Sequence, residues 1–444
     1  MINTMKRQVP RRRFLRTLGG TMTAGVTASL ATSMQRPVIA AVNRAAGSAP
    51  QQVAADESFW REVQQSFSVD RAITYLNTSG ASPSPRVVTD AITRQLLELE
   101  KAPSRNLFVP LAARMEPVRT ELAKLFGCAG DEVAITRNAT DALNTVLLGL
   151  PLSRGEEVLT TTQDYWAMLD ALEQRRRRDG IVVKKITLPI FPRGMDDLVQ
   201  AFERGITPRT KLILVTHPLN LTGQLLPVKQ ICEIAHARGI EVLVDGAQSI
   251  GHFGVKQAEL DCDYFGASLH KWLMAPKETG MLYVKRDKIA KLWPLFPAPD
   301  SVKNDDIRRF EAFGTRSPVL LAIGEAVAYN NDLGAQRKEA RLRFLTRHWV
   351  EQVKTLPKVR FHTSFEPGMN AGGIATMEIT GVSSAALTAY LWSRHQIVVF
   401  DVARRTTEFQ GIRITPHVHT TLEELDRFCD VIETVVSKGL PPTA

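Results

Sequence analysis

Two residues of the 444-residue chain, Asp245 and Lys271, have the types and the setting for covalent chemistry. Asp245 ends an apolar run at 241–245, where an unpaired carboxylate is costly and a nearby cation is favoured. Lys271 follows within residues 268–272, Ser-Leu-His-Lys-Trp. A lysine amine can act as a base or as a nucleophile that condenses reversibly with an aldehyde. The setting of Asp245 therefore predicts a cation that faces it, and Lys271 is the candidate.

Alternating strand-like and helical segments must position this pair. Continuous apolar strands between helices indicate an α/β fold whose mostly parallel sheet is buried on both faces. Ligands bind such sheets beyond the carboxyl ends of the strands, which directs attention to residues 136–140, 161–166, 216–223, 245–248 and 268–271. The predicted strands are 132–136, 157–161, 180–188, 211–216, 241–245, 263–267 and 280–284, and the predicted helices are 141–150, 166–177, 195–202 and 228–238.

The pattern changes after residue 284 and suggests a second domain. Residues 334–353 predict one long helix, and strands and helices then mix to about residue 437. We expect a leader and lead-in at 1–46, a flexible stretch at 47–56, and an N-terminal part of the small domain at 47–100. A large domain at 101–325 and a smaller α+β domain at 326–444 would follow.

The motifs at 244–248 (Val-Asp-Gly-Ala-Gln) and 268–272 resemble the class V aminotransferases, a branch of the fold-type-I pyridoxal-phosphate enzymes. Within that branch the chain resembles the isopenicillin N epimerase-like group. Further matching stretches extend the resemblance over about residues 70–435: 75–77, 136–144, 163–165, 220–223 and 411–417. The resemblance implies the fold-type-I transferase fold, with a seven-stranded sheet in the large domain. It also implies pyridoxal 5′-phosphate as cofactor, without a metal.

The resemblance implies a role for each matching residue. Lys271 would hold the cofactor as a Schiff base and shuttle protons at the substrate α-carbon. Asp245 would pair with the pyridinium nitrogen. The cofactor phosphate would lie at a helix N-terminus, which attracts anions. The residues expected around that phosphate are Ala139, Thr140, Gln248, Ser268 and His270.

Other matching residues complete the predicted site. Tyr165 would stack on the cofactor ring, and Asn220 would donate to its phenolate oxygen. Arg413 suits bidentate capture of a substrate carboxylate, with Asn77 beside it. Thr315, in Phe-Gly-Thr at 313–315, resembles a segment that reaches the phosphate of a partner subunit. The expected assembly is a homodimer with a shared active site.

The N-terminal segment accounts for most of the basic charge. Residues 11–16, Arg-Arg-Arg-Phe-Leu-Arg, resemble a twin-arginine export signal, and a mildly apolar stretch follows to about residue 33. Residues 1–45 hold eight basic side chains and no acid, so the net charge of +10 falls to +2 (10 − 8) without them. We therefore expect export to the periplasm by the twin-arginine machinery, and no nucleic-acid partner.

Several alternatives stay open from the sequence. The cofactor chemistry permits transamination, epimerisation or elimination of an amino-acid or peptide-like substrate. Cysteine desulfurases resemble this chain, but no cysteine lies between residues 397 and 413, where theirs would be. Arg404 and Arg405 either bind a second carboxylate or form a solvated turn. A serine hydrolase, with Ser249 and either His417 or His419, is a distant alternative. The four cysteines leave disulfide formation undecided.

Overall fold

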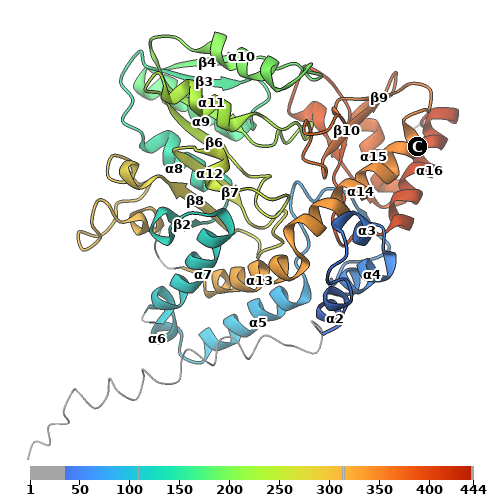
Figure 1. Cartoon of the computed structure of the whole chain (residues 1–444), viewed down its shortest axis with the longest axis horizontal. Coiled ribbons are helices and arrows are strands. Elements are labelled where there is room, and N and C mark those ends of the chain that lie inside the picture. Colours follow the sequence, from blue (N-terminus) through green and yellow to red (C-terminus); the bar gives the residue numbers. More distant parts are fainter. Residues whose placement is uncertain (1–35, 109, 313, 315, 442–444) are drawn as a thin grey trace, which may run out of the picture.

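The computed structural model describes residues 36–441, except 109, 313 and 315. A seven-stranded sheet in the order β2-β8-β7-β6-β5-β3-β4 forms the large domain (Figure 1). Only β8 runs antiparallel to its neighbours, so the prediction of a mostly parallel seven-stranded sheet is confirmed. The strands are β2 (Val133–Thr136), β3 (Glu157–Thr161), β4 (Val182–Ile186), β5 (Thr210–Thr216), β6 (Glu241–Asp245), β7 (Tyr264–Ser268) and β8 (Gly280–Val284).

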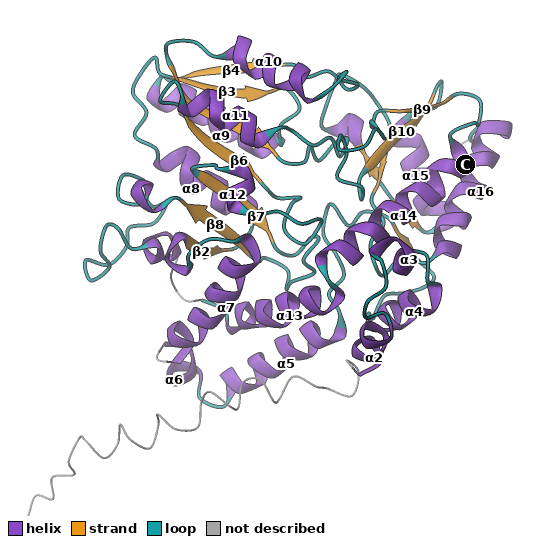
Figure 2. Cartoon of the chain, viewed as in Figure 1, coloured by secondary structure: helices purple, strands orange, loops and turns teal. Residues whose placement is uncertain are grey.

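Helices cover both faces of this sheet (Figure 2), which explains why its strands are continuous apolar runs. On one face, Leu143 and Leu172 pack with Leu243 of β6, and on the other Phe202 and Ile231 pack with Val244 of the same strand. The helices are α7 (Pro110–Phe126), α8 (Ala139–Gly149), α9 (Trp166–Asp179), α10 (Met195–Gly205), α11 (Val228–His236) and α12 (Gln257–Leu260).

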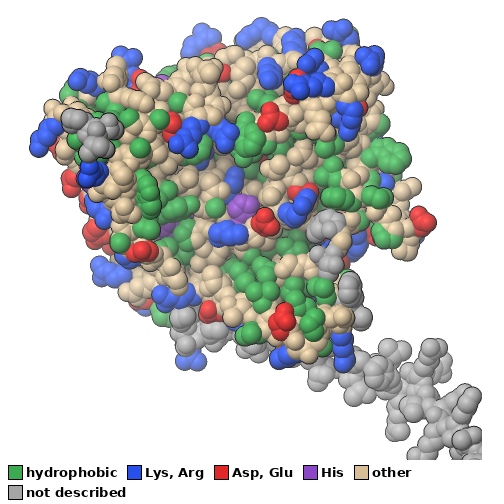
Figure 3. Space-filling model, turned by 180° about the vertical axis from the view of Figure 1, so that it is seen from behind, with side chains coloured by type: hydrophobic (Ala, Val, Ile, Leu, Met, Phe, Trp, Pro, Cys, Tyr) green, Lys and Arg blue, Asp and Glu red, His purple; other side chains and the backbone are tan. Residues whose placement is uncertain are grey.

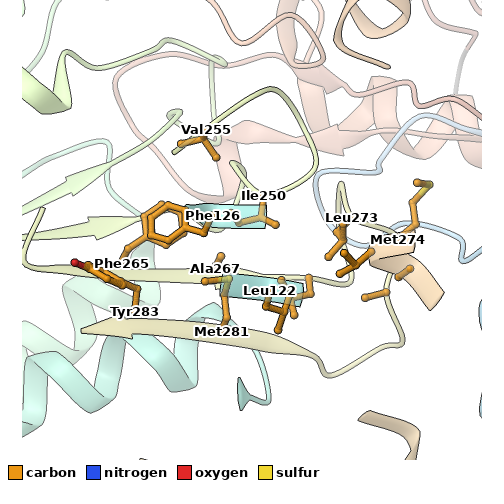
Figure 4. Close-up of a cluster of buried hydrophobic side chains, with 14 of the residues drawn as sticks. Leu122, Phe126, Ile250, Val255, Phe265, Ala267, Leu273, Met274, Met281 and Tyr283 are labelled. Atoms are coloured by element: carbon orange, nitrogen blue, oxygen red, sulfur yellow. The ribbon is translucent and has the colours of Figure 1, made fainter. Parts of the chain in front are cut away.

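The core on the α7 face extends to the chain that follows Lys271 (Figure 4). Phe126 of α7 stacks on Phe265 of β7 with ring centroids 4.4 Å apart. Leu273 and Met274 belong to the same buried cluster. The segment that carries the lysine is thereby anchored in the hydrophobic core on its C-terminal side.

The smaller domain is α+β, as predicted. Its antiparallel sheet has the order β12-β13-β10-β9, and the long helix predicted at 334–353 is α14. Its elements are β9 (Val359–Phe361), β10 (Ala375–Ile379), β12 (Phe400–Asp401), β13 (Ile412–Ile414), α14 (Ala335–Val353), α15 (Ser384–His395) and α16 (Leu422–Lys438). The N-terminal part joins it through β1 (Thr74–Tyr75), which pairs in parallel with β11 (Ile397–Val398). Three more helices, α5 (Arg86–Glu100), α6 (Pro103–Phe108) and α13 (Ile323–Leu333), lie along the base of the molecule in Figure 1.

The expectation of a flexible stretch at 47–56 is wrong. Residues Pro50–Ala54 form α3, which packs against α14 and buries Val53, and α4 (Glu57–Gln65) follows. The helix α2 (Arg36–Arg44) also buries Val38 and packs against α4, so the last part of the expected leader forms a packed helix. The arginines at 11–16 lie outside the described residues. No helix of the described part is long and apolar enough to span a membrane.

Figure 3 shows the face of the molecule that lies behind the view of Figure 1. There, lysines and arginines are interspersed with acidic and apolar side chains over the surface. Many basic side chains are also paired with acids along helices, such as Arg176 and Arg177 with Glu173.

Candidate active site

One cavity lies beyond the carboxyl ends of the strands of the large sheet, as the strand-end rule predicts. Its volume is about 330 Å³, within the size range of small-ligand sites. Every predicted site residue that the structure describes lines it, and Thr315 falls outside the described residues. The predicted residues in its wall are Asn77, Ala139, Thr140, Tyr165, Asn220, Asp245, Gln248, Ser268, His270, Lys271 and Arg413.

Lys271 and Asp245 provide the amine and the acid of this cavity. Lys271 follows β7, and burial lowers its pKa to about 8, with the charge of Asp245 acting in the opposite direction and Arg413 adding to the decrease. Asp245 ends β6 and is 2% exposed. Burial raises the pKa of Asp245 to about 6, although the backbone N–H of Ala247 and the charge of Lys271 both oppose that rise. An amine with such a pKa is partly neutral near pH 8 and can act as a nucleophile or base.

The N-terminus of α8 forms an anion-binding end of the cavity. Asn138 caps this helix by accepting from the Asp141 N–H, and Ser268 Oγ accepts from the Ala139 N–H at 3.1 Å. The helix start approaches β8 so closely that a Cβ at Gly280 would lie 2.6 Å from Asn138 Cα. The backbone N–H groups at this helix start, the hydroxyls of Thr140 and Ser268, and the helix dipole suit a phosphate.

Two neighbouring side chains in the cavity wall are fixed by hydrogen bonds. His270 lies within 3.1 Å of the Thr279 carbonyl through Nδ1, and burial lowers its pKa to about 4, with the charge of Lys271 adding to the decrease. Its ring is therefore neutral, and Nδ1 carries the proton that it donates. Gln248 accepts from Trp272 Nε1 at 2.8 Å and donates to the Ser79 carbonyl at 3.1 Å. These bonds fix the orientation of the Gln248 amide.

Arg413 lies in the floor of the cavity on β13. It is 3% exposed, donates to the Asn220 carbonyl at 2.8 Å and to Asn77 Oδ1 at 3.1 Å, and packs against Phe400. Burial lowers its pKa to about 10, yet the guanidinium stays charged at neutral pH. Its Nε has no hydrogen-bond partner in the described residues. A buried cation with unused donors is suited to a carboxylate.

Several functional residues were not predicted from the sequence. Asp164 is buried beside the site and accepts from the hydroxyls of Thr160 and Thr216 and from the Thr161 N–H at 2.8 Å. Burial raises its pKa. Its position after β3 was a signal, since residues 161–166 were already a strand-end segment. The cavity wall also contains Ser79, Trp166, Thr216 and Phe400.

The polar groups of the site fit pyridoxal phosphate. Asp245 has no cation bonded to it among the described residues, where its one side-chain hydrogen bond comes from the Ala247 N–H at 3.0 Å. Asn220 Oδ1 and Ser79 Oγ are buried without partners there. Such groups need a polar ligand. The described residues contain no group of three or more His, Cys, Asp or Glu that could hold a metal ion.

Fold and cavity together define an enzyme that carries an aldehyde cofactor on a lysine. The family model for class-V aminotransferases matches residues 74–428, and the chain belongs to this family. It is a pyridoxal-phosphate-dependent enzyme that acts at the α-carbon of an amino-acid or peptide-like substrate.

The chain is similar in sequence to an epimerase and similar in fold to two solved structures. Isopenicillin N epimerase of Amycolatopsis lactamdurans is 30% identical over 392 residues, covering 84% of this chain and 98% of the relative. The apo cysteine desulfurase structure from Thermococcus onnurineus NA1 shares 23% identity, with a TM-score of 0.75 and coverage of 86% and 98%. A structure of the protein C-DES, in which glycine is covalently linked to the PLP cofactor, shares 21% identity, with a TM-score of 0.72 and coverage of 81% and 96%.

Proposed function

We propose that this enzyme transfers a proton at the α-carbon of its substrate, in an aminotransferase or epimerase reaction. The observation that carries the proposal is the convergence of the Lys271 amine and the Arg413 guanidinium on one cavity. When bound, pyridoxal phosphate acidifies the α-carbon by withdrawing electrons from it. Arg413 would hold the substrate carboxylate, and Lys271 Nζ would take the α-proton and hold it for the transfer that follows. Asp245, facing the same cavity, would supply the negative charge that keeps the ring nitrogen of the cofactor protonated, and a protonated ring withdraws electrons more strongly.

A C–S or β-elimination lyase is the second candidate, favoured by the likeness to desulfurase structures. The cysteines of this chain argue against the persulfide-forming version. All four are free thiols, and none is among the residues that line the cavity. Cys429 lies within α16, 4% exposed, and burial raises its pKa to about 12. A thiol of that kind is a poor nucleophile.

The serine hydrolase alternative conflicts with the geometry. Ser249 is fully buried and donates its hydroxyl to the His217 carbonyl. His417 accepts from the Val418 N–H through Nδ1, so its Nε2 carries the proton and faces the Trp272 carbonyl at 3.3 Å. Neither group is placed to activate the other.

Incubation of the holoenzyme with candidate amino acids in heavy water tests the proposal. Aminotransferase activity releases a keto acid, and epimerisation introduces deuterium at the α-carbon without net loss of the amine. Release of ammonia together with a keto acid that has lost its β- or γ-substituent, or release of sulfide, would overturn it in favour of a lyase, because transamination keeps the side chain and frees no ammonia. The K271A variant is the matched control and should do none of these.

Export and dimer formation belong to the same proposal. The twin-arginine-like motif at 11–16 supports export in the folded state to the periplasm by the twin-arginine machinery. Fusion of residues 1–46 to a reporter should give export that is lost when Arg11, Arg12 and Arg13 become lysines. The segment at 313–315 supports a homodimer with a shared site. Sedimentation of the holoenzyme should give twice the chain mass, and a monomer would contradict it.

A further inference from the structure

The two adjacent arginines of the 402–411 loop point to different places. Arg405 lines the active-site cavity, and its guanidinium carbon lies 4.3 Å from the centroid of the Trp166 ring. Arg404 is absent from the cavity lining, and its Nε lies 3.5 Å from Asp401 Oδ2. Only one of the pair can therefore contact a ligand in the cavity, and the other is its natural control.

The position of Arg405 is set by contacts on both sides of it. Trp166 begins α9, lines the cavity and is 38% exposed, so it lies where the cavity meets solvent. Three residues after Arg405, Glu408 accepts from Gln163 Nε2 at 2.7 Å and also from the Thr162 hydroxyl. The loop is thus attached to the start of α9 at two points.

The charge of Arg405 is open to a ligand. No carboxylate lies within ion-pair distance of it in the described part of the chain, whereas Arg404 pairs with Asp401 and Glu408 is occupied. A guanidinium stacked on an aromatic face keeps its N–H groups free along its edge. Such an edge matches the planar, two-oxygen geometry of a carboxylate.

The cavity therefore has two cationic ends at different depths. Arg413 is buried in its floor, and Arg405 is exposed at its mouth, with Tyr165, Trp166 and Phe400 in the same wall. To reach Arg405, a substrate held by its α-carboxylate at Arg413 would extend its side chain past these rings. We propose that Arg405, seated on Trp166, binds a second carboxylate at the far end of the substrate. The substrate class is then an amino acid or short peptide with a distal carboxylate, an inference that rests on the proposed function through the role of Arg413.

Binding of unreactive acids tests this subsite without relying on turnover. Calorimetry on the holoenzyme would compare each diacid from succinate to suberate with the monoacid of equal carbon number, for example adipate with hexanoate. The preference for the diacid is the ratio of its affinity to that of the monoacid. For a diacid long enough to reach both arginines, this ratio should fall roughly fivefold in R405A, equivalent to about 1 kcal/mol for a partly exposed pair. R404A should keep the preference, and R405K should retain part of it. A salt increase from about 0.05 to 0.5 M should weaken it in the unmodified protein.

Two results would overturn the subsite. One is an unchanged diacid preference in R405A at every length, and the other is an equal fall in R404A, which would indicate a diffuse loop charge. Comparison of glutarate with N-glutarylglycine then separates a free side-chain carboxylate from one at the end of a peptide bond. Borohydride reduction and mass spectrometry of the same samples report separately whether Lys271 holds the cofactor, so the proposed function can fail independently.

Discussion

Lys271 and Lys338 are both enclosed by the protein, but their amines meet different surroundings. Lys338 of α14 is 1% exposed, and burial lowers its pKa to about 7. Its Nζ donates to the Trp272 carbonyl and to Asn330 Oδ1 at 3.0 Å. The Lys271 amine makes no hydrogen bond or ion pair among the described residues, and it faces a cavity that Asp245 also lines. Both lysines therefore have a lowered pKa, whereas of the two it is Lys271 that lies beside a cavity and a carboxylate.

The two lysines are connected through Trp272. Lys271 precedes this residue, and Lys338 binds its carbonyl. The Trp272 ring stacks on His252 at 3.8 Å and on His417 at 5.4 Å, and His417 continues to His419 at 5.8 Å. Burial lowers the pKa of these histidines, so the stack is uncharged. The comparison contrasts an amine that lies unpaired beside a cavity with a second amine that is hydrogen-bonded within the structure.

The largest expected effect separates the two amines. K271A should lose activity by at least about a thousandfold, because it removes both the covalent attachment and the base. After borohydride reduction, mass spectrometry should find the cofactor mass on the peptide that contains residue 271. K338M should keep that modification and most of the visible absorbance. Loss of the modification in K338M with an intact circular dichroism spectrum would break the distinction.

The next effect concerns the acid that faces Lys271. D245N removes the charge that raises the pKa of this amine, so that pKa should fall below about 8, by roughly one unit or more. Acylation of Lys271 in the cofactor-free protein, followed by mass spectrometry across pH 6–10, measures it. The inflection should move to lower pH in D245N and stay in place in D164N, whose carboxylate is not among the charges that act on this amine. An unchanged inflection in D245N would show that the two groups do not interact.

The strand-end rule and the motifs located most of this site from the sequence. Asp245, Ser268 and Lys271 are local signals, since each follows a run of apolar residues that predicts a strand. The ring stack and Lys338 could not be found in this way, because a buried lysine and an exposed one look alike in a helix. Their environment depends on contacts between distant parts of the chain, such as Trp272 with His417. The prediction for residues 47–56 failed for the same reason. Their composition predicts a loop, but packing on α14 makes Pro50–Ala54 helical.

A smaller effect tests the structural lysine through stability. The unfolded chain binds a proton at this lysine up to a pKa of about 10.4, whereas the folded protein releases it near pH 7. The unfolded state thus binds more protons between these values, and stability should rise with pH by up to about 1.4 kcal/mol per unit. K338M should reduce this rise between pH 7 and 9, measured as the urea midpoint of the holoenzyme. Parallel curves for both proteins would show that Lys338 does not titrate in this window.

The smallest expected effect divides the stabilisation of Lys338 between its two acceptors. N330A removes one acceptor and leaves the Trp272 carbonyl. A hydrogen bond from a charged amine contributes about 1.5–3 kcal/mol and one from a neutral amine about 0.5–1.5 kcal/mol. N330A should therefore lower the free energy of unfolding more at pH 6 than at pH 9. The double variant N330A/K338M should lose this pH dependence, since no amine remains to change its charge. A loss equal at both pH values would mean that Asn330 stabilises the fold by packing, and that the ammonium depends on the Trp272 carbonyl.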